Sequence, residues 1–171
     1  MKTRKFLIAL PGALLALSAL AAGDHAGGHE ADAIGKPGVA AKVSRTIKVD
    51  MTDNMRFNFS NVAVKQGETV RFVVKNSGKV KHEMVLGTRK ELKEHAEAMK
   101  KNPGMEHADE NRVTVEPGKA GEIIWQFTRA GKVDYACLQP GHYEAGMKGI
   151  VTVAGSGKAA AKEQGHSDHK H

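Results

Sequence analysis

The chain has 171 residues, of which 26% are charged, and it carries a formal net charge of +7 at pH 7. Its basic residues are spread along the sequence without a basic-aromatic stripe, which argues against a nucleic-acid-binding protein. A single cysteine excludes an internal disulfide, so the thiol is buried, paired with another chain or bound to a metal.

The N-terminus has the pattern of a secretory signal peptide. Basic residues within the first five positions precede an apolar run over 6–20, and Ala19 and Ala21 supply the small residues of a cleavage site. A membrane anchor is the weaker alternative, because this run is shorter than the roughly 20 apolar residues of a spanning helix. We therefore predict a signal peptide over 1–22, cut after Ala21 or Ala22, export to the periplasm, and no membrane anchor after cleavage.

The next segments predict an arm and then a β domain. Residues 23–43 are rich in glycine, alanine and charge without periodicity, which predicts a flexible arm. From residue 44, short runs of alternating polar and apolar residues are separated by turn residues, which predicts an antiparallel β-sandwich or barrel. The expected strands are 46–51, 69–75, 83–87, 122–127, 131–136 and 149–153.

One segment interrupts the strands with a helical composition. The expected insertion covers about 88–104, where Thr88 and Glu91 have the spacing of a capping box. Leu92, His95, Ala96 and Met99 share one helix face, and Pro103-Gly104 is expected to end the helix. We expect this helix to pack against the outside of the sandwich.

The segment YACLQPGHYEAGMKG carries the strongest chemical signal. Cys137, His142 and Met147 follow one another at five-residue intervals directly after the expected strand 131–136. A thiolate, an imidazole and a thioether belong to the ligand set of a type 1 copper site, where soft sulfur suits Cu(I) and imidazole suits Cu(II). Such a site needs a second imidazole, and His82, between a turn and a strand, is the candidate.

Two stretches resemble the cupredoxin family, which includes plastocyanins, azurins and pseudoazurins. YACLQPGHYEAGMKGIVTV resembles the family's C-terminal copper loop, and VKQGETVRFVVKNSGKVKHEMVLG resembles the segment with the first histidine ligand. The resemblance covers 44–154 and implies one bound copper ion, with His82, Cys137 and His142 as equatorial ligands and Met147 as the axial ligand. It implies an all-β, cupredoxin-like Greek-key β-sandwich with one helical insertion and flexible N- and C-terminal arms.

One position departs from the family pattern. Glu83 stands where plastocyanins and azurins usually carry asparagine, so the amide donor that ties their two ligand loops is missing here.

The HEMVLG segment, the insertion and the histidine-bearing arms are most similar to periplasmic copper-resistance cupredoxins of the CopI kind. This predicts a periplasmic type 1 copper protein of copper tolerance, with copper ions and a periplasmic redox or copper-trafficking protein as partners. The alternative is a soluble electron-transfer cupredoxin of a respiratory or photosynthetic chain. Catalysis is not expected, because a trinuclear cluster needs several His-x-His pairs, and His169 with His171 form the only one.

Other histidines and methionines are weaker copper candidates. Residues 155–171 predict a disordered tail, and histidines there and in the arm are candidates for additional weak copper sites or are solvated. Cleavage after Ala22 would leave Gly23-Asp24-His25, a strong Cu(II) chelate. A soft Cu(I) site around the insertion is less favoured than helix packing; its residues would be His95, Met99, Met105 and His107.

Overall fold

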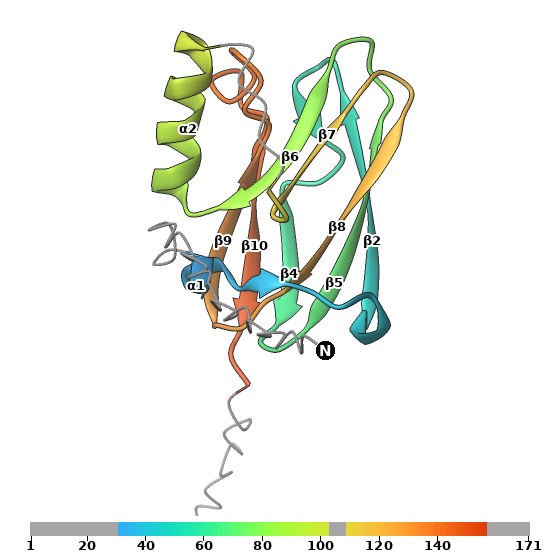
Figure 1. The fold of residues 1–171 in the computed structure, drawn as a ribbon, viewed down its shortest axis with the longest axis vertical. Coiled ribbons are helices and arrows are strands. Elements are labelled where there is room, and N and C mark those ends of the chain that lie inside the picture. Colours follow the sequence, from blue (N-terminus) through green and yellow to red (C-terminus); the bar gives the residue numbers. More distant parts are fainter. Residues whose placement is uncertain (1–30, 103–108, 157–171) are drawn as a thin grey trace, which may run out of the picture.

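A computed structural model describes residues 31–102 and 109–156, which form two facing five-stranded sheets and a flanking helix (Figure 1). The first sheet has the order β1 (Lys36–Pro37), β8 (Ala120–Gln126), β5 (Thr69–Asn76), β2 (Arg45–Thr52), β3 (Arg56–Phe57). The second has the order β4 (Asn61–Lys65), β10 (Lys148–Ala154), β9 (Gly131–Ala136), β6 (His82–Gly87), β7 (Arg112–Val115). Within the described ranges, no helix has the length and apolar character needed to span a membrane.

The predicted all-β sandwich is confirmed, but its strands are not all antiparallel. β2 pairs with β5 in parallel, and so does β4 with β10, while the other neighbours are antiparallel. The reason is the path of the chain, which leaves the first sheet after β3, forms β4 in the second sheet and returns as β5. A strand that is reached by crossing between sheets can run in the same direction as its neighbour.

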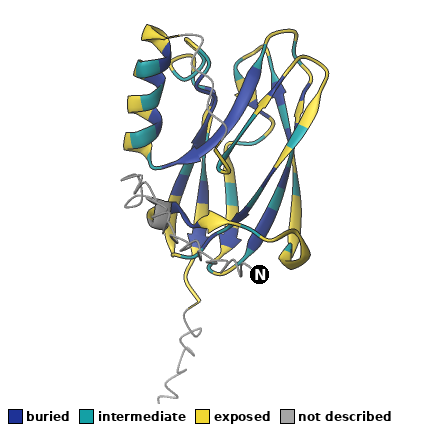
Figure 2. Ribbon diagram, viewed as in Figure 1, coloured by how far each residue is buried: buried dark blue, intermediate teal, exposed yellow. Residues whose placement is uncertain are grey.

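The core lies between the two sheets and follows the expected period of two. On β5, Val70, Phe72 and Val74 are fully buried, and Figure 2 shows buried and less buried positions alternating along the strands. Phe72 packs edge to face on Phe127, with ring centroids 6.3 Å apart. The burial of apolar side chains between the two sheets is the main stabilising contribution to such a sandwich.

The predicted helical insertion is α2 (Arg89–Lys101), and its capping box is present. The Thr88 hydroxyl accepts the Glu91 N–H while the Glu91 carboxylate accepts the Thr88 N–H. Leu92 and Ala96 are buried in a second apolar cluster on the outer face of β6 and β9. The helix ends at a cap on Asn102, and the expected stop at Pro103-Gly104 lies outside the described residues.

Strand β6 is buried on both faces as a result. Met84 and Leu86 point into the core, whereas Val85 faces α2. All six residues of β6 are buried, so packing on both faces holds this strand, and His82 at its start, in place.

Part of the expected arm, residues 31–43, forms short elements, one of which pairs with the sandwich. Residues 31–43 form α1 (Ala31–Ile34), β1 and η1 (Ala40–Lys42), and β1 pairs with β8. The Trp125 indole N–H donates to the Ile34 carbonyl over 2.8 Å, and Ile34 is buried. One buried apolar side chain, the indole hydrogen bond and backbone pairing hold this segment, and such contacts leave no periodic pattern in the sequence. Residues 1–30 and 157–171, including the predicted signal peptide and most of the tail, lie outside the described residues.

Candidate metal centre

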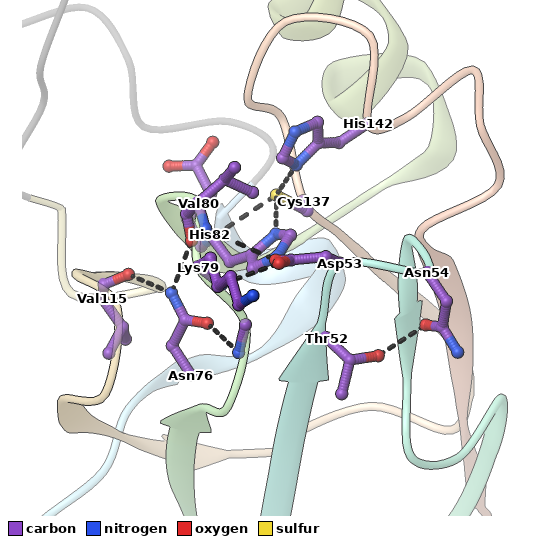
Figure 3. Close-up of polar contacts among 12 residues, drawn as sticks. Thr52, Asp53, Asn54, Asn76, Lys79, Val80, His82, Val115, Cys137 and His142 are labelled. Atoms are coloured by element: carbon purple, nitrogen blue, oxygen red, sulfur yellow. Dashed lines mark hydrogen bonds and ion pairs between the residues drawn. The ribbon is translucent and has the colours of Figure 1, made fainter.

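Three of the four predicted ligands meet at one end of the sandwich. Cys137 Sγ lies 3.3 Å from His142 Nδ1 and 3.9 Å from His82 Nδ1, and all three donor atoms lie within 4.8 Å of one another. The close-up in Figure 3 shows both rings turned toward the sulfur. Within the described part of the chain, no other cluster brings together three histidine, cysteine or carboxylate donors in this way.

The spacing of the donors fits a single metal ion. Three donors that bind one ion at about 2.0 to 2.3 Å in a trigonal plane are separated by roughly 3.5 to 4 Å. The two distances from sulfur to nitrogen, 3.3 and 3.9 Å, lie close to this range. One thiol and two imidazoles also form the equatorial donor set of a type 1 copper site.

Neighbouring strands place the first two donors. His82 is the first residue of β6, and Cys137 directly follows β9, which is the antiparallel neighbour of β6. In this register, the start of one strand lies beside the end of the other. The pairing therefore brings together two residues that are 55 positions apart in the chain.

The loop from Cys137 to Met147 positions the third donor through its own backbone. The His142 N–H donates to the Gln139 carbonyl over 2.9 Å, and the Met147 N–H donates to the His142 carbonyl over 3.0 Å. The Cys137 N–H donates to the Met147 carbonyl over 3.0 Å, which closes the loop at its base. Gly146 has φ +96°, a left-handed conformation that glycine adopts at little cost, so the chain can turn back there.

The fourth predicted ligand, Met147, is fully buried at the base of this loop and belongs to the apolar core. Arg56 on β3 supports the same loop from outside, because its guanidinium donates to the Ala145 carbonyl over 2.7 Å. The loop is thus held at both its base and its outer edge.

Burial sets the protonation of the donors in the metal-free protein. Desolvation raises the pKa of Cys137 to about 12, although N–H groups of Glu83 and Gln139 point at the sulfur and oppose the rise. Burial and the neighbouring His82 ring hold the pKa of His142 below its ordinary value. The thiol therefore keeps its proton at neutral pH until a metal displaces it, while the His142 ring is neutral and can offer a lone pair.

Glu83 ties the two ligand segments, although the amide donor usual in plastocyanins and azurins is absent. Its backbone N–H donates to Cys137 Sγ over 3.4 Å, and its carboxylate accepts the Leu138 N–H over 3.1 Å. The Thr114 hydroxyl donates to the other carboxylate oxygen over 3.3 Å. The two segments are therefore tied without an amide donor, because the Glu83 side chain accepts a hydrogen bond from the cysteine loop.

Asp53 is a contact of the site that the sequence analysis missed. It lies in the turn between β2 and β3, and its Oδ1 is 3.2 Å from His82 Nε2, on the ring edge away from the sulfur (Figure 3). The Lys79 N–H holds the pKa of the Asp53 carboxyl below its ordinary value, and His82 lowers it further. An aspartate in a turn is too common for its sequence alone to reveal this contact.

Buried Asn76 holds the segment that leads to His82. Its side-chain amide donates to the Val80 and Val115 carbonyls over 2.8 and 2.9 Å, and its side-chain oxygen accepts the Gly78 N–H. The segment between β5 and β6 is thus fixed to β7, which orients the histidine at its end.

The suggested secondary copper sites receive no support from the described residues. Met99 is buried on α2, as expected for a helix packing face, and His95 is partly buried beside it. Met105, His107 and the histidines of the arm and tail lie outside the described residues.

Comparison with known proteins identifies relatives of the whole domain. The model of the family described as copper-binding proteins, plastocyanin/azurin family, matches residues 43–154. The copper-resistant cuproprotein CopI of Rubrivivax gelatinosus is 54% identical, over 75% of this chain and 80% of that protein. A protein of the same name from Pseudomonas aeruginosa is 39% identical, over 84% of this chain and 96% of that protein.

Solved structures with the same fold include auracyanins. Reduced auracyanin of Roseiflexus castenholzii has a TM-score of 0.56 and 25% identity, and the match covers 66% of this chain and 98% of that one. Auracyanin B has a TM-score of 0.58 and 24% identity, covering 70% of this chain and 96% of that one, and it supports the fold alone.

Proposed function

Because the chain belongs to the plastocyanin/azurin family of copper-binding proteins, we propose that it is a periplasmic type 1 copper protein that contributes to copper tolerance. The observation that carries the proposal is the grouping of two imidazole nitrogens around one thiol sulfur at the end of the sandwich. The similarity to the CopI proteins favours tolerance as the role, and the signal-peptide pattern over 1–22 favours export. The proposed division of the chain keeps the leader at 1–22 and the tail at 155–171.

The proposed ligands are His82, Cys137 and His142 in the equatorial plane and Met147 on the axis. Support for the first three is their mutual distance, and support for Met147 is its burial and its hydrogen bond to Cys137 at the base of the loop. Copper, when bound, supplies a one-electron couple between Cu(I) and Cu(II).

The chain's own contribution is to hold soft and hard donors in one fixed arrangement. Sulfur donors favour the reduced ion and imidazoles suit the oxidised ion, so neither state is strongly excluded. The hydrogen-bonded loop and the buried strand β6 resist rearrangement of these donors. His82 and Cys137 are fully buried, whereas His142 is partly exposed and is the ligand that offers a route to solvent.

We expect the substitution Met147→Leu to retain copper and raise the reduction potential. Leucine fills a similar buried volume but removes the weak axial donor, which is one of the determinants of the potential of such sites. Voltammetry of the purified copper protein measures the shift, and Met84→Leu is the control because Met84 is equally buried in the core. An unchanged potential in the Met147 variant would refute the axial assignment.

Copper tolerance can be tested in the organism that produces the protein. A deletion strain should grow poorly at high copper, and the wild-type gene should restore growth while Cys137→Ala should not. Growth that is unaffected by the deletion at every copper concentration would count against the tolerance role.

Electron transfer is the second candidate, favoured by the partly exposed position of His142. In that case the copper protein should exchange electrons rapidly with a periplasmic cytochrome or reductase of the same organism. A stopped-flow measurement with those proteins separates the two roles, because tolerance does not require fast exchange.

A further inference from the structure

The ring of His82 has two different partners, one on each nitrogen. Nδ1 faces the Cys137 sulfur at 3.9 Å, and Nε2 faces Asp53 Oδ1 at 3.2 Å. The imidazole is fully buried, so water does not compete for either nitrogen. A neutral imidazole carries its proton on one nitrogen, and a carboxylate beside Nε2 attracts the proton there.

The Asp53 carboxylate is itself held in place. Oδ2 accepts the Lys79 N–H over 2.7 Å, and Oδ1 accepts the Val80 N–H over 3.4 Å. Position 78 is a glycine, and any side-chain carbon there would collide with the carboxylate. The turn between β2 and β3 is thereby joined to the segment that leads into β6, and the orientation of Asp53 follows from that connection (Figure 3).

This arrangement has defined consequences for a ligand histidine. Donation from Nε2–H to a carboxylate leaves the Nδ1 lone pair free to bind a metal, fixes the ring plane and increases the basicity of Nδ1. A negative charge near the ion also stabilises the higher oxidation state more than the lower one. Because 38% of the Asp53 side chain is exposed, solvent weakens this stabilisation of the higher oxidation state without removing it.

We propose that Asp53 is a positioning residue of the copper centre, which fixes the tautomer of His82 and lowers the reduction potential through its carboxylate. The proposal rests on the proposed function, since it assumes that His82 binds copper through Nδ1. It assigns to the site a preference for Cu(II) that the four ligands alone do not specify.

The test compares Asp53→Asn and Asp53→Ala with the wild-type protein. The asparagine variant keeps the size of the side chain and loses the charge, whereas the alanine variant loses the acceptor as well. Glu116→Gln is the matched control, because it also removes one carboxylate charge and it pairs with Lys81, next to His82, without touching the ring. Circular dichroism establishes which variants are folded. If the alanine variant is unfolded, the asparagine variant alone decides the test.

We expect both Asp53 variants to bind Cu(II) about 10-fold to 100-fold more weakly than wild type. Cu(I) affinity should fall less, so the reduction potential should rise, and Glu116→Gln should match wild type. Wild-type potential and Cu(II) affinity in the Asp53 variants would overturn the proposal.

A second readout needs no copper. Nitrogen chemical shifts of His82 in the metal-free protein should show the proton on Nε2 in wild type and a mixture of tautomers in Asp53→Ala. Identical tautomers in both would overturn the positioning role. If wild-type protein took up copper without a thiolate band, the proposed function would fail, and these shifts would still decide the role of Asp53.

Discussion

The substitution Cys137→Ser is expected to abolish the intense visible absorption of the copper-loaded protein. That band arises from charge transfer between a thiolate and Cu(II), and the chain has no other sulfur that can form a thiolate. A serine hydroxyl at this fully buried position would remain protonated and would be a much poorer ligand. Absorption spectra at equal copper loading measure the effect.

Ala136→Ser is the control for this prediction. Ala136 is the last residue of β9 and is as buried as Cys137, but its side chain belongs to the cluster under α2 rather than to the donor group. This variant should keep the band. Persistence of the band in Cys137→Ser would show that the sulfur of Cys137 is not a ligand.

The substitution Glu83→Ala is expected to cause a large loss of stability in the metal-free protein. Without the carboxylate, the N–H of buried Leu138 loses its acceptor inside the protein, whereas the hydroxyl of exposed Thr114 can donate to water instead. Each unsatisfied buried group costs about 1 to 3 kcal/mol, and the cavity left by the side chain adds to this cost. Urea unfolding followed by circular dichroism measures the change in the free energy of unfolding.

Glu83→Gln separates this effect from a simple loss of charge. Its amide oxygen can still accept the Leu138 N–H, so this variant should lose much less stability than Glu83→Ala. Both variants keep the backbone N–H that points at Cys137 Sγ, so the copper band should survive in each folded protein. Equal stability of the alanine and glutamine variants would contradict the role of Glu83 as a tie between the ligand segments.

The strands that the sequence predicts are those with long alternating patterns, such as β5 and β8. β4 (NVAVK) and β7 (RVTV) were missed because each has only two valines over five and four residues, too few for a period of two to stand out from the surrounding loops. The parallel pairing of β2 with β5 also escaped prediction. It depends on the path of the chain between the two sheets, and local patterns carry no information about that path.

The loop that carries Cys137, His142 and Met147 could be singled out because its candidate donors lie within eleven consecutive residues. His82 could be proposed because a turn and a strand-like run flank it. Asp53 could not, because its contact with His82 joins residues 29 positions apart through two loops whose relative placement follows from the whole fold. The tie at Glu83 was missed for a chemical reason, since the family's tie uses an amide donor, whereas here a carboxylate acceptor makes the connection.

Titration of the mature protein with Cu(II), followed by absorption and electron paramagnetic resonance, tests the central claim most directly. We predict that the thiolate band saturates at one copper ion per chain and that the resonance spectrum is that of a type 1 site. Any copper bound beyond this first ion, for instance by the histidines of the arms, should leave the band unchanged. Copper uptake that produces neither the band nor a type 1 spectrum would contradict the account.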